Sequence, residues 1–144
     1  EFIEKLKDTF VFNKSSSSPL RPSVKGEFSV YLNHNWYSFS FTSKDIPSET
    51  IANLDVSKLS DYILEPVLKI VDQRNDHRID FIGGIRGLEE LEKCVDCGEM
   101  AVAFALHPVT MKELLDVADA GEIMPPKTTW FEPKLRSGLF VHEL

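Results

Sequence analysis

Apolar and polar residues alternate in two short runs, EFSVYL and WYSFSFT, between residues 27 and 42. Every second residue of each run is apolar, which is the period of a β-strand with one buried face. The intervening residues, Asn33, His34 and Asn35, tolerate a positive φ. The pattern therefore predicts a β-hairpin.

Four segments carry apolar residues at the three- and four-residue spacing of an amphipathic helix: residues 2–6, 56–63, 88–95 and 111–118. Asp55 and Thr110 are suited to cap the second and the fourth of these helices. Gly98 and Gly121 follow the third and the fourth, where a left-handed residue commonly ends a helix. The sequence therefore predicts helices with defined starts and ends.

The region from residue 79 to 106 predicts a strand–helix–strand unit. Ile79–Ile82 is a short apolar run before a glycine turn, and Met100–Leu106 is a second run after the helix. Alternate residues of the second run are alanines, which let a helix approach closely. This order predicts a βαβ unit with a right-handed crossover. With the hairpin, it predicts an α+β domain with a mixed sheet and helices packed mainly on one face.

The domain organisation follows from a stretch without periodicity, NKSSSSPLRPSVKG at residues 13–26, which predicts a Ser/Pro linker. We therefore predict an N-terminal helix and linker over residues 1–26 and a single α+β domain over residues 27–144. A length of 144 residues suits one such domain. Because the chain does not begin with Met and its first helix lacks a cap, we expect it to be part of a longer protein.

The composition, 42% hydrophobic and 27% charged, is that of a soluble globular protein. No apolar run could cross a bilayer, and neither a signal peptide nor a disulfide framework is visible, so we expect a cytoplasmic protein without a membrane partner. The net charge of −7 lies between residues 88 and 122, which hold nine acidic residues and two lysines. This excess disfavours direct binding of nucleic acid by the chain.

The turn Gly83-Gly84-Ile85-Arg86-Gly87 is the strongest candidate site. Backbone N–H groups at a helix start attract anions, and glycines let an anion approach the backbone. Arg86 adds a guanidinium that suits phosphate or carboxylate. The alternative is that the glycines only form a tight turn and that Arg86 pairs with a neighbouring glutamate.

A second candidate is MPPKTTWFEPKLRSGL, residues 124–139. Its prolines exclude a helix and favour an extended, cationic segment with a hydroxyl donor. The alternative is that its cations balance the acidic helices and its aromatic residues belong to the core. The predicted ligand-binding residues of both segments are Gly83, Gly84, Arg86, Gly87, Lys127, Thr129, Lys134 and Arg136.

The sequence identifies no catalytic residues and no cofactor, and we predict no metal site. Cys94 and Cys97 have the spacing of a redox or metal motif. They lie at the end of a helix beside Asp96 and Glu99, where negative charge raises the pKa of a thiol. A second pair of zinc ligands is missing from the sequence.

Three stretches, LEPVLKIVDQRNDHRIDFIGGIRGLEEL, GEMAVAFALHP and DAGEIMPPKTTWFEPKLRSGLFVHEL, resemble the carboxy-terminal part of the domain-of-unknown-function family 1015. Members of that family are sometimes labelled SpoOJ/ParA/ParB/RepB-like, and their Asp-Gly-His-His-Arg-type motif belongs to an amino-terminal half. The resemblance therefore implies a C-terminal domain whose partner is a missing N-terminal half. It supplies no reaction.

Two functions stay open. The chain could contribute a binding surface for a small anion, such as a nucleotide, phosphate or carboxylate, to a larger protein. It could instead be a structural or oligomerisation domain without a ligand, which leaves a homodimer open. The first function requires Arg86 and the cationic segment to face one pocket that solvent can reach.

Overall fold

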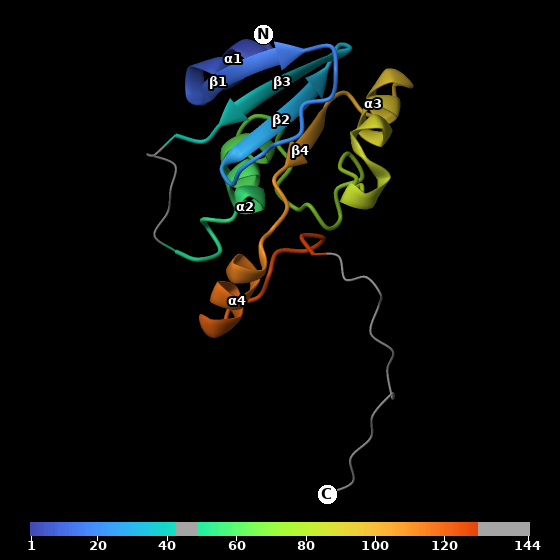
Figure 1. The fold of residues 1–144 in the computed structure, drawn as a ribbon. Helices are drawn as coiled ribbons and strands as arrows, with labels where there is room; N and C mark the ends of the chain where they lie inside the picture. The colour runs from blue at the N-terminus through green and yellow to red at the C-terminus, as the bar shows by residue number, and fades with distance from the viewer. Residues whose placement is uncertain (43–48, 130–144) are drawn as a thin grey trace, which may run out of the picture.

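The computed structural model describes residues 1–42 and 49–129. Within these ranges the centre of the protein is an antiparallel sheet of four strands in the order β1-β3-β2-β4 (Figure 1). The strands are β1 (Val11–Ser16), β2 (Glu27–Leu32), β3 (Asn35–Ser40) and β4 (Ala103–Leu106). Helices pack around this sheet, which confirms the α+β class.

Strands β2 and β3 form the predicted hairpin. Asn33 and His34 make its two-residue turn with φ values of 49° and 61°, and this left-handed pair matches the twist of the flanking strands. Phe28 pairs with Phe39 and Val30 with Tyr37, so the apolar residues of both strands share one face. The predicted hairpin is confirmed, but its strands are buried on both faces rather than one, since Tyr31 and Trp36 on the second face are 4% and 0% exposed.

One face of the sheet is covered by α1 (Phe2–Thr9), α2 (Asp55–Leu59) and η2 (Ser60–Leu64), a π-helical continuation of α2. The Phe10 ring meets the Phe28 ring edge-on, with 5.2 Å between their centroids. The buried residues of this core are Leu6, Phe10, Phe28, Val30, Phe39, Leu59, Ile63, Leu64 and Ile70. Helix α1 and the continuous α2–η2 segment therefore cover the same face of the sheet.

The other face is covered by α3 (Leu88–Asp96). Its residues Leu88, Leu91 and Val95 pack against a cluster of Tyr31, Trp36, Ala103 and Ala105. The two alanines belong to β4, and their small side chains leave room for the helix, as the sequence predicts. Both faces of the central hairpin are therefore buried.

The predicted βαβ unit and mixed sheet are wrong. Residues 79–82 form no strand, and β4 pairs antiparallel with β2 rather than parallel to a preceding strand. Strand β2 already has β3 on one side and β4 on the other, so it offers no edge to residues 79–82. A short apolar run does not by itself distinguish a strand from an irregular connection.

The predicted linker is also shorter than expected, because residues 13–16 belong to β1. This edge strand has a bulge between Phe12 and Lys14, where the Asn13 amide donates hydrogen bonds to the hydroxyls of Ser38 and Ser40 at 3.3 and 2.9 Å. Its last four residues, 13–16, are all polar, so the apolar alternation that reveals a strand is missing. Helix α1 consequently packs in the same core as the hairpin, and strand β1 belongs to the same sheet.

Helix α4 (Met111–Asp119) lies beyond the end of β4, away from the sheet (Figure 1). Thr110 and Glu113 form a capping box at its start, which confirms the cap predicted there. The cap predicted at Asp55 is wrong, because Leu54 takes the cap position of α2 and Asp55 is its first helical residue. Gly98 and Gly121 follow α3 and α4 with φ values of 83° and 69°, which confirms the predicted ends. None of the helices in the described residues is long and apolar enough to span a bilayer.

We expect Leu6→Ala to lower the free energy of unfolding by about 2–5 kcal/mol, because Leu6 is buried in the shared core. Val11→Ala, at an exposed position on β1, serves as the control and should change it by less than about 0.5 kcal/mol. Urea unfolding followed by circular dichroism measures both. Equal, small effects would show that α1 is not integrated into the core.

Candidate functional site

The glycine turn takes a defined shape in which its glycines have different roles. Gly84–Arg86 form the single 3-10 turn η3, and Gly87 immediately precedes α3. Gly87 has φ 79° and ψ 175°, a region that glycine alone occupies readily. Gly83 has the ordinary extended values φ −62° and ψ 135°, and a Cβ on Gly84 would meet nothing within 4 Å. The backbone therefore requires glycine at Gly87 but not at Gly84.

The start of α3 leaves donors for an anion. Among the described residues no side chain caps its first backbone N–H groups. Arg86 ends the preceding turn with an exposed side chain, and it forms no ion pair within the described part of the chain. The alternative, in which Arg86 pairs with a neighbouring glutamate, is therefore not observed among the described residues. A guanidinium two residues before the first residue of α3, together with free N–H groups at that helix start, suits a phosphate or a carboxylate.

The protein also places its own carboxylate at this position. A Cβ built on Gly87 would lie 2.5 Å from Glu89 Oε2, so the Glu89 side chain folds back over the start of α3. Glu89 and Glu90 both lie in the first turn, where negative charge is favoured by the helix dipole. An incoming anion would have to displace the end of the Glu89 side chain.

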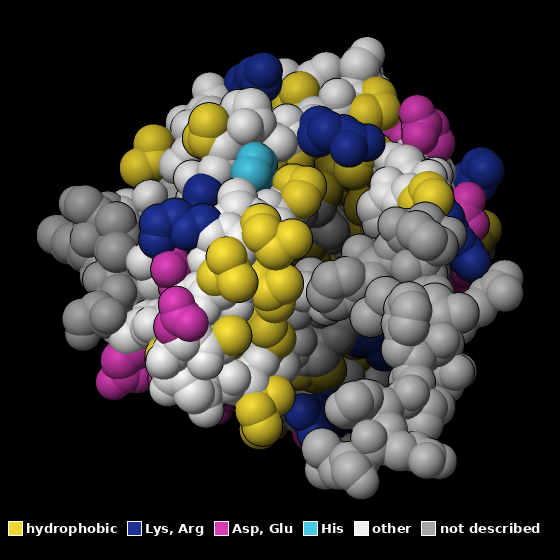
Figure 2. All heavy atoms as spheres, turned by 60° about the horizontal axis from the view of Figure 1, so that its bottom comes forward, with side chains coloured by type: hydrophobic (Ala, Val, Ile, Leu, Met, Phe, Trp, Pro, Cys, Tyr) yellow, Lys and Arg dark blue, Asp and Glu magenta, His cyan; other side chains and the backbone are white. Residues whose placement is uncertain are grey.

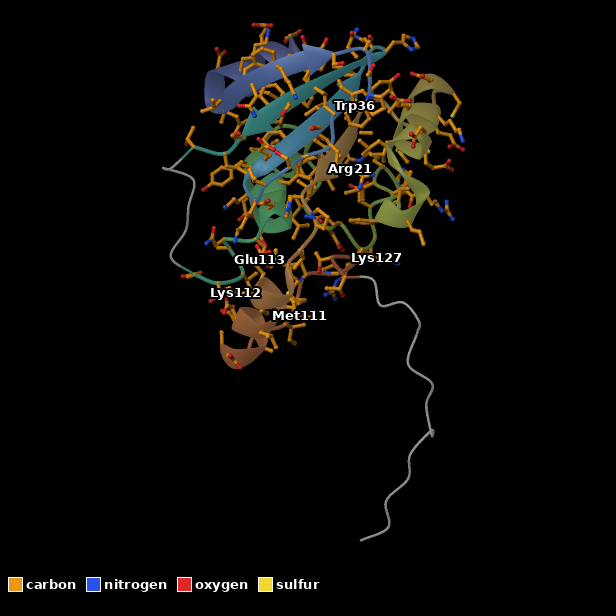
Figure 3. The ribbon with its side chains drawn as sticks, in the orientation of Figure 1. Arg21, Trp36, Met111, Lys112, Glu113 and Lys127 are labelled. Carbon is orange, nitrogen blue, oxygen red and sulfur yellow. The ribbon has the colours of Figure 1, made fainter. Side chains whose placement is uncertain are left out.

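The described part of the proline-rich segment forms a turn rather than a strand. The Thr128 hydroxyl donates a hydrogen bond to the Pro125 carbonyl at 2.7 Å, and Lys127 between them has φ 63°. Lys127 and Thr129 are exposed, and Lys127 lies below the start of α3 in the view of Figure 3. The predicted residues Lys134 and Arg136 lie outside the described residues.

A cavity of about 270 Å³ adjoins the two prolines but not the glycine turn. Pro125 and Pro126 line it together with side chains of α2, η2 and residues 71–74. Arg74 and Asp61 contribute opposite charges to its wall. Neither this cavity nor the second one described below includes Arg86, so the described residues do not show the predicted convergence on one pocket.

A second cavity of about 380 Å³ lies beside α4 and is acidic. Its lining includes Glu49, Asp116 and Asp119, and its one cation among the described lining residues is Lys25. Lys25 Nζ lies 2.8 Å from Glu113 Oε1, which connects the start of β2 to the capping box of α4. The sequence revealed the excess of acid here but not the cavity.

A buried carboxylate, Asp55, holds α2 near the start of β2 and also pairs with a lysine of its own helix. Asp55 and Lys58 are 7% and 3% exposed, with 3.8 Å between Asp55 Oδ1 and Lys58 Nζ. The other oxygen, Asp55 Oδ2, accepts a hydrogen bond from the Gly26 N–H at 2.8 Å. Burial raises the pKa of the Asp55 carboxyl, while the Gly26 hydrogen bond and the charge of Lys58 act in the opposite direction. These contacts give the pair a structural role.

Two acidic residues of α3 anchor that helix to the hairpin. The Trp36 Nε1–H donates to Glu92 Oε1 at 2.7 Å, and the Tyr31 hydroxyl lies 3.0 Å from both oxygens of Asp96. His34 Nδ1 in the hairpin turn lies 3.0 Å from Asp96 Oδ1. The sequence shows the excess of acid over residues 88–122 but not this anchor, because the partners of the two acids lie 56 and 65 positions earlier in the chain.

The two cysteines lie at the end of α3 and in the residue that follows it. Both are free, and Cys97 Sγ lies 3.5 Å from the Cys94 carbonyl oxygen. Burial, and then the charges of Glu99 and Glu90, raise the pKa of the Cys94 thiol, which is the direction that the sequence predicts. Among the described residues no group of three or more His, Cys, Asp or Glu could hold a metal ion.

No protein-family model, curated protein or solved structure matches this chain. The resemblance to the domain-of-unknown-function family 1015 therefore stays a prediction.

We expect Gly87→Ala to lower the free energy of unfolding by about 1–3 kcal/mol, because alanine would be strained at its φ and ψ. Gly84→Ala is the matched control in the same turn, where a Cβ meets open space. Denaturant unfolding of both variants measures the difference. Equal effects would show that the unusual backbone of Gly87 is not what requires glycine.

The stability of the protein should fall in alkaline solution as Tyr31 ionises. Burial, followed by the hydrogen bond to Asp96 and the charge of Glu92, raises the pKa of Tyr31 above its usual 10.0. A raised pKa in the folded state contributes stability below pH 10.0 that is lost as the pH rises through the folded value. Ultraviolet titration of tyrosinate should show a late step that Tyr31→Phe removes. If the titration step that Tyr31→Phe removes has a pKa of 10.0 or lower, the expectation is contradicted.

Proposed function

We propose that this chain contributes a binding surface for a small anion, a nucleotide, phosphate or carboxylate, at the entrance to α3. The observation that carries the proposal is the pairing of uncapped N–H groups with the neighbouring Arg86 side chain, which has no ion-pair partner among the described residues. In this proposal the N–H groups hold anionic oxygens along the helix axis. Arg86 adds a second, charged pair of hydrogen bonds.

The other predicted residues contribute from the proline-rich segment. Lys127 and Thr129 are exposed and available as donors, and Lys134 and Arg136 would extend the cationic surface. In this proposal the missing N-terminal half of the protein completes the site and supplies any catalytic groups. The chain therefore acts as one wall of a larger binding site.

The second candidate function is a purely structural or oligomerisation domain. Two observations favour it. The backbone conformation of Gly87 is a sufficient reason for glycine at that position, without any ligand. The carboxylate of Glu89 already lies at the helix start, where an anion would bind. Gly84 separates the two candidates. Neither its φ nor its surroundings require glycine, so a larger side chain at Gly84 tests for a bound anion without straining the fold.

A thermal-shift titration with inorganic phosphate, nucleotides and small dicarboxylates tests the proposal. A ligand present at about 100 times its Kd should stabilise the folded chain by about 2.7 kcal/mol. Arg86→Ala should abolish this shift, and Gly84→Val should reduce it without a loss of stability in the absence of ligand. Lys14→Gln, an exposed cation on β1, is the control and should leave the shift unchanged.

Glu89→Gln should change anion binding in the direction opposite to Arg86→Ala. Removing the competing negative charge should tighten anion binding, by about tenfold if roughly 1.4 kcal/mol of repulsion is relieved. The absence of any thermal shift, in this chain and in the longer protein, would remove the proposed anion site and leave the structural function.

A further inference from the structure

Helix α4 exposes apolar side chains that the described part of the chain does not cover. Met111 and Leu115 lie four residues apart, hence on one face of the helix, and are 66% and 55% exposed. Ile123, shortly after the helix, is 84% exposed. Figure 2 shows hydrophobic side chains gathered on the face of the molecule that carries α4, with acidic side chains beside them.

The fold uses the other side of α4. Of the nine residues of this helix, Val117 is the buried one, and Glu113 holds the helix start to Lys25. Figure 3 shows Glu113 on the side of the helix nearer the sheet. A surface helix normally buries its apolar stripe to be stable. The stripe of Met111 and Leu115 is therefore unused by the described core.

Acidic residues outnumber cations around this stripe. The acidic cavity beside α4 is lined by Glu49, Asp116 and Asp119. The cations nearby are already engaged, since Lys25 pairs with Glu113 and Lys112 pairs with Asp116 at 2.6 Å. Asp119 forms no ion pair within the described residues.

We infer that α4 and the acidic cavity beside it form a docking surface for a basic, apolar polypeptide segment of a partner protein. Aliphatic side chains of that segment pack on Met111 and Leu115, and a lysine or arginine enters the cavity towards Asp119. Apolar anchors next to opposite charge give a docked segment both affinity and orientation. The surface has the opposite charge preference to the proposed anion site and does not depend on it.

Charge and size both disfavour a second copy of this chain as the occupant. Each copy carries the same acidic cavity lining beside α4, so two α4 surfaces would repel one another. A stable interface buries about 1,200 Å² or more, and a nine-residue helix offers far less than that. A basic partner gains from the same charge that a second copy would have to overcome.

Binding of a synthetic amphipathic peptide of leucine and lysine to the full chain, followed by fluorescence anisotropy, tests the inference. A peptide with glutamate in place of lysine should not bind. Leu115→Gln and Asp119→Asn should each weaken binding of the leucine–lysine peptide by about tenfold, since each removes one main contact. Val71→Gln, which changes a 75% exposed valine outside α4, and Glu99→Gln are the matched controls and should bind as the unaltered chain does.

Three results would overturn the inference. The first is absence of binding to the unaltered chain. The second is equal binding by the α4 variants and the controls, which would mean that the peptide responds to net charge alone. The third is a dimer, seen by analytical ultracentrifugation without peptide, that Leu115→Gln dissociates, because the occupant would then be a second copy. Unchanged unfolding midpoints would show that the variants still fold.

Discussion

Burial of the β2–β3 hairpin on both faces is the constraint on which the rest of the structure depends. One face is aromatic and aliphatic, and it takes α1 and α2. The other face combines Tyr31 and Trp36 with small residues, since Ser29 pairs with Ser38 on one side and with Ala105 on the other. The small residues make room for α3, and the large ones carry the polar groups that fix it. The sheet can therefore be a single central layer in a short chain.

The acidic residues of the two later helices have different roles because of this arrangement. On α3, Glu92 and Asp96 are acceptors for Trp36 and Tyr31, so part of the negative charge holds the helix in place. Asp96 lies at the last residue of the helix, while Arg86 lies in the turn before its first. The anchor and the candidate anion site are thus at opposite ends of one rigid element. On α4, Glu113 pairs with Lys25 and Asp116 with Lys112, while Asp119 forms no ion pair within the described residues and remains available to a partner.

Local patterns predicted local structure well and spatial neighbours poorly. The hairpin turn at Asn33 and His34, the Thr110 cap and the alanines of β4 depend on residues close in sequence, and all three were predicted. Strand β1 was missed because it is a polar edge strand, and the βαβ unit was wrong because topology depends on which strand edges are free. For the same reason the sequence identified Gly87 as a helix entrance, yet it could not show whether Arg86 and Lys127 face one pocket.

An acidic chain that binds an anion must create a locally favourable potential against its overall charge. In physiological salt the screening length is about 8 Å, so carboxylates farther away than this repel an anion only weakly. The decisive charges at the start of α3 are therefore the adjacent ones, Arg86 in favour and Glu89 against. The same screening lets α4 keep an acidic surface without penalising a site elsewhere on the molecule. In the proposed anion site, short-range charge at the start of α3, rather than the net charge of −7, thus decides whether an anion binds.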